Sequence, residues 1–571
     1  MVLAVVVVGG GAVLALQFLR GSSDALVAHV PADAVAYGHL NLDPSASNKL
    51  GIAALIDRVN DAAGEELISI DGVMADLDAD ADGIAFATDI DPWLGDQMAI
   101  YAQAFPVTDA QTFETTPPSV AAVVTLEDAE AAATFVQDQQ PLGSWDAGQG
   151  RQGWLVQGQA SDPDAVVVAI DGDRLYVGTP DAVRAGLDTT DGLATGDGYA
   201  AAVGALPDRV LTVWVDVAAA VDGIAASGQM VPDATDLPAS VALGVSFTRG
   251  AVDVTTVAMG GGDQLLGGDR IARADLAALP SGGILYGLVP DLGAQLPRLL
   301  ASADDSVRSA AASSGQALAD ADLPSAQADA ELQQQFGTTV ADIASWMGDV
   351  AFALAYDPAL PSDNAGFQMH IAVADEQAAT NLLDTALADL PPEEGFVVEP
   401  GRATAGDAVV QVADGRWSLT AGAFAGPGTL AEDQSFTTAV DGLDGETVLY
   451  VDIRGLTEAI AAFALPADDP QAQQVADVAG AFDSLVATVE VDGDVTRSVL
   501  RVAYGQPLQP VVGGQEGNPP DIDLGPLGTV DALVDGQDGA LDLAEPVDPG
   551  AGGGAVGGRQ QGTLEPAGSG G

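Results

Sequence analysis

Cysteine is absent from the 571 residues of this chain, and basic residues are scarce. Without cysteine there is no disulfide framework, no thiol nucleophile and no metal site built on thiolates. Only 18 residues are basic against 83 that are acidic, and Lys49 is the only lysine. The formal charge of −65 makes nucleic acid and anionic lipid surfaces poor partners for the chain as a whole.

Aromatic residues are also few, at 5% of the chain, although 48% of the residues are hydrophobic. The cores are therefore built mainly from alanine, valine and leucine, whose small side chains bury less area each. Single domains usually stop growing near about 250–300 residues, so a chain of this length predicts two domains.

The acidic residues are spread through both halves of the chain. Their mutual repulsion weakens a compact state in dilute buffer, whereas in about 1 M salt the Debye length shrinks to roughly 3 Å and the repulsion fades. We hypothesise adaptation to salty surroundings, and compositional drift in a proteome rich in Ala, Gly and Asp is the alternative. A stability that does not rise between low and molar NaCl would contradict the hypothesis.

The N-terminal run from Met1 to Leu19 carries no charge, and Arg20 ends it. At about 1.5 Å per residue such a helix is near the lower limit for spanning a bilayer core. We expect residues 1–20 to form a single transmembrane helix at the cell membrane, with the bulk of the chain extracytoplasmic. A cleaved signal peptide, with Val13 to Ala15 as its cleavage site, and a buried core helix are the alternatives.

Six sequence markers occur twice in the same order, which predicts a tandem duplication. The repeats span residues 28–262 and 272–505. The paired markers are "PADAVAYGHL" from Pro31 and "PSGGILYGLV" from Pro280, "WLGDQMAI" from Trp93 and "WMGDVAFA" from Trp346, "TLEDAEAAATF" from Thr125 and "VADEQAATNLL" from Val373, "DAVVVAIDGDRLYV" from Asp164 and "DAVVQVADGRWSL" from Asp407, "LTVWVDV" from Leu211 and "TVLYVDI" from Thr447, and "TVAMG" from Thr256 and "RVAYG" from Arg501.

Each repeat mixes strand and helix patterns. Short runs rich in β-branched and aromatic residues flank Asp171-Gly172 and Asp414-Gly415, which favours antiparallel hairpins. Ala-rich segments at 127–139 and 292–332 predict helices. The predicted fold class is α+β, with a mostly antiparallel sheet and packed helices in each repeat. Residues 506–571, rich in Gly, Pro, Asp and Gln, predict a disordered acidic tail.

Two motifs resemble a known family. "VPADAVAYGHLNLDPS" from Val30 to Ser45 follows a hydrophobic segment and precedes "PWLGD" from Pro92 to Asp96. Together they resemble the uncharacterised actinobacterial family called domain of unknown function 3352, over roughly residues 28–505. The resemblance implies a membrane-anchored protein with its bulk outside the cytoplasm and no assigned activity. It supplies no catalytic or binding residues.

One stretch has the spacing of a calcium loop. In "DLDADADGIAFATD", Asp78, Asp80 and Asp82 precede a glycine, and Asp89 stands at the twelfth loop position. The second repeat has the uncharged "LQQQFG", Leu332 to Gly337, at the matching place. A solvated acidic helix end is therefore the main interpretation and a calcium site the alternative. No other cofactor is predicted.

No catalytic set emerges from the remaining chemistry. The three histidines, His29, His39 and His370, lie beside or within predicted strands, and no serine has a nucleophile motif around it. Trp93 and Trp346 suit a core more than a ligand groove. The matched acids could act as an acid and a base only if the two repeats faced each other; these are Asp96 with Asp349 and Asp216 with Asp452.

The sequence therefore predicts a non-catalytic protein of the cell envelope that binds or scaffolds a lipid, a glycan or another protein. The alternative is a carboxylate-dependent hydrolase acting in the cleft between the repeats. Neither the ligand nor the oligomeric state follows from the sequence.

Overall fold

The computed structural model describes residues 24–64, 69, 84–105, 107–108, 115–159, 161–226, 237–260, 275–314, 318–356, 365–388, 397–424, 426–464 and 476–504. All belong to the first of two compact units, which ends at residue 510. The predicted membrane helix, residues 1–20, and the predicted tail, residues 506–571, lie outside the described residues. Among the helices that are described, none combines the length and the apolar character needed to span a bilayer.

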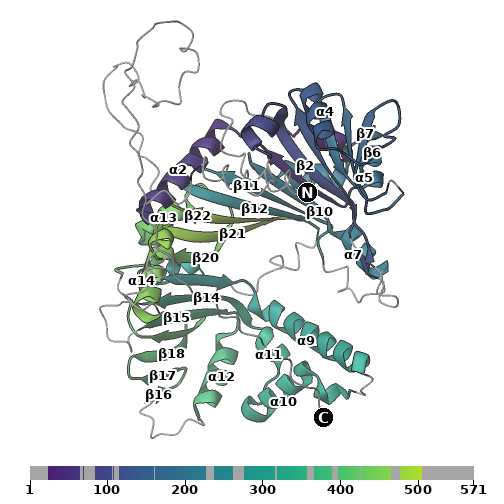
Figure 1. Cartoon of the computed structure of the whole chain (residues 1–571). Coiled ribbons are helices and arrows are strands. Elements are labelled where there is room, and N and C mark those ends of the chain that lie inside the picture. The colour runs from purple at the N-terminus through teal and green to yellow at the C-terminus, as the bar shows by residue number, and fades with distance from the viewer. Residues whose placement is uncertain are drawn as a thin grey trace, which may run out of the picture. The chain divides into compact units, whose positions relative to one another are not determined.

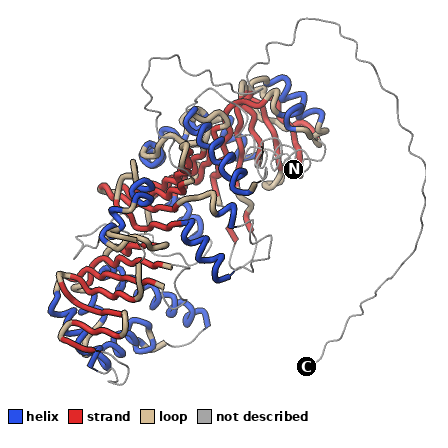
Figure 2. Tube along the Cα trace, turned by 90° about the vertical axis from the view of Figure 1, so that its left-hand side faces the viewer, coloured by secondary structure: helices blue, strands red, loops and turns tan. Residues whose placement is uncertain are grey.

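Twenty strands form one antiparallel sheet, which confirms the predicted α+β class and the antiparallel pairing. Residues 24–260 are called the first half and residues 275–504 the second half. Figures 1 and 2 show the strands following one another through both halves. The first half contributes, from its outer edge inward, β6 (Gly143–Ser144), β7 (Gln152–Gln157), β8 (Val166–Asp171), β9 (Arg174–Gly178), β5 (Ser119–Leu126), β2 (Leu94–Ala104), β1 (Ala36–Asn41), β10 (Leu211–Asp216), β11 (Ser240–Phe247) and β12 (Ala251–Met259).

The second half continues the sheet with ten more strands in the same kind of order. From the junction outward they are β22 (Val495–Ala503), β21 (Ser484–Asp492), β20 (Glu446–Asp452), β13 (Leu285–Val289), β14 (Met347–Ala355), β15 (Gly366–Val373), β19 (Arg416–Ala421), β18 (Ala408–Ala413), β17 (Arg402–Ala405) and β16 (Val397–Glu399). A separate pair joins β3 (Val107–Thr108) to β4 (Thr115–Thr116).

The two halves join through one strand pair, β12 with β22. Each strand has nine residues and is the last strand of its half. Their middle residues, Thr255 and Val499, lie opposite each other, and Ala251 lies opposite Ala503. The junction is therefore isologous, because the same edge of each half forms both sides of it, as in a two-fold symmetric dimer.

Helices pack against the sheet in both halves. Those of the first half are η1 (Leu26–His29), α2 (Ala46–Ala63), η2 (Phe86–Ile90), α4 (Ala129–Asp138), α5 (Pro180–Leu187), η3 (Leu193–Thr195), α6 (Asp197–Gly204) and α7 (Val217–Ala226). Those of the second half are η5 (Leu276–Ala278), α9 (Leu292–Ser314), η6 (Asp320–Asp322), α10 (Pro324–Phe336), α11 (Val340–Ala344), α12 (Glu376–Ala388), η8 (Leu430–Glu432), α13 (Gln434–Val440) and α14 (Ile453–Ala464).

The predicted local elements form for the expected reasons. Helix α4 begins after Asp128, whose carboxylate accepts hydrogen bonds from the amides of Glu130 and Ala131. Both predicted hairpins are present, β8 with β9 and β18 with β19. Asp414 and Gly415 adopt φ of 55° and 70°, the left-handed conformation that this turn requires.

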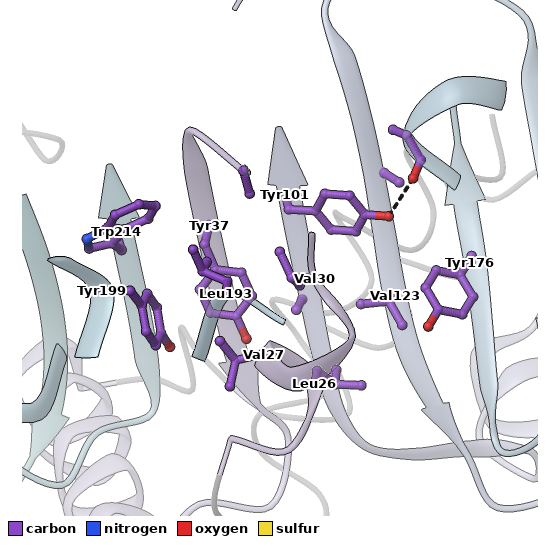
Figure 3. Close-up of a cluster of buried hydrophobic side chains, with 14 of the residues drawn as sticks. Leu26, Val27, Val30, Tyr37, Tyr101, Val123, Tyr176, Leu193, Tyr199 and Trp214 are labelled. Atoms are coloured by element: carbon purple, nitrogen blue, oxygen red, sulfur yellow. Dashed lines mark hydrogen bonds between the residues drawn. The ribbon is translucent and has the colours of Figure 1, made fainter. Parts of the chain in front are cut away.

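The core of the first half is built on aromatic residues at the centre of the sheet. Tyr37 on β1 lies opposite Trp214 on β10, and Tyr199 packs edge-on against both rings. Tyr101 donates a hydrogen bond to the carbonyl of Ala182 at 2.8 Å, which fixes α5 on the sheet. Figure 3 shows these rings together with the aliphatic side chains between them. The second half repeats the central pair, with Tyr286 on β13 opposite Tyr450 on β20.

Candidate functional site

The three histidines have structural surroundings. His39 is buried, and Arg209 and Asp24 both act on it electrostatically, yet burial is the main reason why its pKa is lowered. Burial also lowers the pKa of His29, which contacts Arg174, and that of His370. His370 lies opposite Ser418 across β15 and β19, and the Ser418 hydroxyl donates to the carbonyl of Gln411. Among the described residues no cluster of potential metal ligands is present.

Both repeated tryptophans lie in the core, as predicted. Trp93 donates its indole N–H to the carbonyl of Asp89 at 2.6 Å and packs against Phe135. Trp346 stacks on Trp417 with ring centres 6.3 Å apart. Neither side chain is more than 6% exposed, so neither lines a ligand groove.

Only one of the four predicted calcium-loop acids lies within the described residues. Asp78, Asp80 and Asp82 lie outside the described residues, whereas Asp89 is in η2. Its Oδ2 accepts a hydrogen bond from the amide of Ala85 at 2.9 Å, and its Oδ1 accepts one from the hydroxyl of Thr88 at 3.1 Å. Asp89 therefore orders the start of η2.

The first matched acid pair, Asp96 and Asp349, supports strands. Asp96 accepts a hydrogen bond from the hydroxyl of Thr125 at 3.3 Å, across β2 and β5. Asp349 is fully buried and accepts the amide N–H of Asp291 at 2.7 Å. The two acids support their own halves and do not meet.

The second matched pair begins two helices. Asp216 accepts the amide of Ala219 at 2.9 Å at the start of α7, and Asp452 accepts the amide of Gly455 at 3.1 Å at the start of α14. A carboxylate in this position satisfies free N–H groups of the first helical turn. Of the four matched acids, Asp452 also lines a large pocket.

That pocket, called the seam pocket, has a volume of about 590 Å³ and lies where the two halves join. The first half contributes α2 and the turn between β11 and β12, and the second contributes α13, the start of α14 and the ends of β21 and β22. Figure 1 shows α2, α13 and α14 gathered at one end of the junction strands. Its charged residues are Arg58, Arg249, Arg454, Arg501, Asp441, Asp452 and Asp483.

The seam pocket has more basic than acidic residues, whereas the chain as a whole has far more acidic than basic ones. Lys49 is one of the 18 basic residues, which leaves 17 arginines, and four of them line this pocket against three acids. Each half supplies two of the four. Lys49 itself is buried against Asp43 at 2.5 Å, so arginine supplies the cationic side chains that are accessible here.

Two arginines from different halves share one carboxylate oxygen. Arg58 on α2 lies 3.8 Å from Oδ1 of Asp483, and Arg454 on α14 contacts the same oxygen. Arg58 also donates from Nε to the carbonyl of Ala481 at 3.1 Å. The shared carboxylate leaves several guanidinium N–H groups free to bind another acceptor.

Arg501 forms the firmest ion pair of the pocket. Its Nε and Nη2 donate to the two oxygens of Asp253 at 2.8 Å, in the bidentate geometry that suits a guanidinium. Nη1 donates to the carbonyl of Asp441 at 2.8 Å. Asp253 is on β12 and Arg501 on β22, so this pair joins the halves as well as forming a pocket wall.

Arg249 is the least constrained of the four. It is exposed in the turn between β11 and β12, and its side chain forms no ion pair or hydrogen bond with the residues that the structure describes. Thr248 holds the turn, because its amide donates to the carbonyl of Ala251 at 2.8 Å. The Arg249 guanidinium therefore has its donors available.

The strand ladder gives Arg501 an uncharged counterpart in the first half. Tyr450, Val486 and Arg501 lie opposite one another on β20, β21 and β22. By strand register the corresponding row in the first half consists of Trp214, Ala242 and Val257, one residue beyond the Thr256 that the sequence markers match to Arg501. Val257 is fully buried.

Two more arginines have no basic counterpart in the other half. Arg454 is the second residue of α14, and the second residue of α7 is Ala218. Arg249 lies in the turn before β12, whereas the turn before β22 has Gly493 and Asp494 and no basic residue. The strand order shared by the halves does not require these arginines, which favours a role specific to this place.

Burial raises the pKa of Asp452, and the neighbouring Asp433 and Glu458 add to the effect, while N–H groups of α14 oppose it. A raised carboxyl pKa in a pocket is a common sign of function. Here the hydrogen bond to Gly455 gives the group a structural role as well.

Sequence comparison gives the chain a family. The profile described as "Protein of unknown function (DUF3352)" matches residues 1–448, more than half of the chain. The chain belongs to the DUF3352 family. No curated protein matches this DUF3352 protein in sequence. The family has no assigned activity.

Solved structures show only a distant likeness. Crystal forms III, IV and I of TP0453 match with TM-scores of 0.22, 0.22 and 0.20 and sequence identities of 11%, 12% and 11%. Each match covers 42% of this chain and 80%, 83% and 81% of the TP0453 chain, respectively. TM-scores of this size carry no argument about the DUF3352 protein.

Proposed function

We propose that this DUF3352 protein is a non-catalytic binding protein that holds an anionic ligand in the seam pocket. The observation that carries the proposal is the gathering of four of 17 arginines in one pocket of a chain with charge −65. Guanidinium groups recognise carboxylates and phosphates through paired N–H donors. Placing them together in so acidic a chain is specific enough to indicate a ligand.

The surroundings of the acids favour binding over hydrolysis. Hydrolysis by paired carboxylates needs two of them on either side of a reacting bond. Asp96 and Asp349 support strands, Asp216 begins α7, and none of the three lines the seam pocket. Of the acids that do line it, Asp483 is paired with two arginines and Asp452 begins α14, so the hydrolase alternative is the weaker one.

We also propose that residues 1–20 hold the protein at the cell membrane with its bulk outside the cytoplasm. The uncharged run from Met1 to Leu19 supports this placement. Asp24 follows shortly afterwards, and its carboxylate accepts hydrogen bonds from the hydroxyls of Tyr37 and Tyr199. Five residues span at most roughly 17 Å, so the first half would lie near the membrane surface. Release of the full chain from membranes by alkaline carbonate would contradict the anchor.

Native mass spectrometry of the full chain, purified from its own host, tests the binding role. We expect a co-purified anionic molecule on the wild type and its loss from the double variant Arg249→Gln/Arg454→Gln. The control is Arg184→Gln/Arg308→Gln, which removes the same charge from two exposed helical ion pairs elsewhere. A wild type without an anionic ligand, or a double variant that keeps it, would contradict the proposal.

A further inference from the structure

We propose that the seam-pocket ligand carries a phosphoryl group on a hydroxyl-bearing body, and that the Asp483 carboxylate competes with this phosphoryl group for Arg58 and Arg454. This inference rests on the proposed anion-binding function and names its ligand class. It depends on the geometry around Asp483, on the donors of the pocket and on its other two acids.

Asp483 is placed where an incoming anion would be bound. The side chain is 28% exposed, and its Oδ1 receives one guanidinium from each half. Oδ1 is buried and has no partner in hydrogen-bond geometry among the described residues, although both guanidinium groups lie close to it. Asp483 is held at the end of β22, since its amide donates to the carbonyl of Ala503 at 2.7 Å. A free anion, which can turn to align with both guanidinium groups, would satisfy them better.

The available donors outnumber what a carboxylate can use. Arg249 offers its whole guanidinium, and the hydroxyls of Ser435 and Thr438 line the pocket without a hydrogen bond to other described residues. A phosphoryl group presents three strong acceptor oxygens in a tetrahedral arrangement, whereas a carboxylate presents two in a plane. Donors approaching from α13, α14 and the β11–β12 turn suit the tetrahedral group.

The acids of the pocket indicate the rest of the ligand. Asp441 and Asp452 line the same space as the arginines and would repel a second anionic group. Carboxylates accept hydrogen bonds from hydroxyls, so these two suit a neutral polyol body. A volume of about 590 Å³ is several times that of a phosphate ion and falls within the usual range for small-molecule sites.

Isothermal titration of the full chain in detergent micelles, at constant moderate salt, tests the inference with four probes. Glycerol 3-phosphate supplies a phosphomonoester on a polyol, glycerate replaces the phosphoryl group by a carboxylate, and glycerol has no charge. Glycerophosphoglycerol supplies the diester found in lipid headgroups. We expect glycerol 3-phosphate to bind about tenfold or more tighter than glycerate, and glycerol not to bind.

Variants at Asp483 test the competition. Asp483→Asn and Asp483→Ser should each tighten glycerol 3-phosphate binding by about tenfold, because the competing charge is removed. Thermal unfolding of both variants checks that they are folded, and the smaller serine provides a second reading should asparagine disturb the loop. The matched control Asp305→Asn, in an exposed pair with Arg308, should change nothing.

The outcomes distinguish a wrong ligand class or a wrong role for Asp483 from a wrong proposed function. Equal affinity for glycerate and glycerol 3-phosphate would overturn the phosphoryl class and leave anion binding intact. Unchanged affinity in both Asp483 variants would overturn the competition. If no anion bound to the wild type or to either variant, the proposed function itself would be wrong. Binding of the diester would support a lipid headgroup as the source, and binding of the monoester alone would support a soluble phosphate ester.

Discussion

Each half of the sheet has a tyrosine at the corresponding place on its central strand, and the two hydroxyls have different hydrogen-bond partners. In the first half the Tyr37 hydroxyl donates to the two oxygens of Asp24 at 2.8 and 2.9 Å. In the second half the Tyr286 hydroxyl donates to the carbonyl of Pro280 at 2.9 Å and accepts the amide N–H of Gly283 at 2.6 Å. The first half therefore depends on a charged side chain where the second uses backbone groups.

Asp24 also brings further ionisable groups close to Tyr37. Tyr199 also donates to Asp24, and Nε2 of His39 lies 3.7 Å from it. Burial, with Asp24 as the next cause, holds the pKa of Tyr37 well above its usual value. Burial raises the pKa of Tyr286 only to about 12. We expect the stability of the first half to depend more on charge and pH.

The two central strands also differ on the face that lies away from the tyrosine. Each has a glycine there, and the space beside this glycine is open in one half and filled in the other. Gly38 lies opposite Ile100, beside an apolar hollow of about 420 Å³. Gly287 lies opposite Phe352, whose ring covers the glycine so closely that an added Cβ would lie 2.4 Å from it. The two halves thus share a strand order but differ in side chains at corresponding positions. The arginines of the seam pocket are a third such difference, after the tyrosine partners and the residues that face the two glycines.

Breaking the ion pair at the junction should have the largest effect on this comparison. Asp253→Ala leaves the Arg501 guanidinium, 15% exposed, without its carboxylate, which should cost about 3 kcal/mol. Because the pair joins the halves, their different stabilities should then show as two separate unfolding transitions in urea. The control Asp305→Ala, in an exposed pair, should cost less than about 0.5 kcal/mol. A single transition with unchanged midpoint would contradict the expectation.

Removing the Asp24 carboxylate should cause the second-largest loss of stability. Asp24→Ala leaves the hydroxyls of Tyr37 and Tyr199 buried without their acceptor, at a cost of about 2 kcal/mol. Tyr286→Phe in the second half should cost about 1 kcal/mol, because only backbone hydrogen bonds are lost. Asp33, an exposed acid in the first half, provides the control as Asp33→Ala. Equal losses for Asp24→Ala and Tyr286→Phe would show that the charge has no special role.

Replacing the glycines of the two central strands by alanine should cause smaller losses of stability. Gly287→Ala should cost about 1 kcal/mol, because the Phe352 ring must move to admit the methyl group. At Gly38 the nearest atom to an added Cβ is Cγ2 of Ile100 at 3.1 Å, and the neighbouring hollow lets it move. Gly38→Ala should therefore cost less than about 0.5 kcal/mol. Chemical denaturation measures both, and a larger cost at Gly38 would refute the comparison.

The smallest effect should come from His39. Its pKa is lower in the folded chain than in the unfolded one, mainly through burial, so protonation favours the unfolded state. Arg209 lowers the pKa further, while Asp24, Gln97 and Asp96 raise it. The stabilisation is complete above pH of about 6.5 and is lost as the pH falls toward the folded-state pKa. Denaturation between pH 7 and 5 should show a smaller acid loss for His39→Gln, and an unchanged slope would exclude this role.

Much of the fold follows from local patterns in the sequence. Asp414-Gly415 specifies a hairpin and Asp128 begins a helix, because each of these depends on neighbouring residues and backbone preference. The burial of Trp93 and Trp346 follows from their size. These features need no knowledge of which strand edges meet.

The seam pocket could not be predicted in the same way. Arg58, Arg249, Arg454 and Arg501 are far apart in the sequence, and only the pairing of β12 with β22 brings them together. No periodicity indicates which edge strands join. The only usable signal in the sequence is the scarcity of basic residues, because in a chain with 18 of them every arginine is a candidate for a specific role. The role of Asp24 does not follow from the sequence, because this residue lies in a short segment without a motif.

The central claim is that the seam pocket binds an anion through arginines of both halves. Anomalous diffraction from crystals of the full chain soaked in sodium tungstate tests it most directly, because tungstate is a heavy tetrahedral oxyanion. The prediction is a strong tungsten peak in the pocket beside Arg249 and Arg454, absent from crystals of Arg249→Gln/Arg454→Gln. No peak in the wild-type pocket, or the same peak in the double variant, would contradict the account.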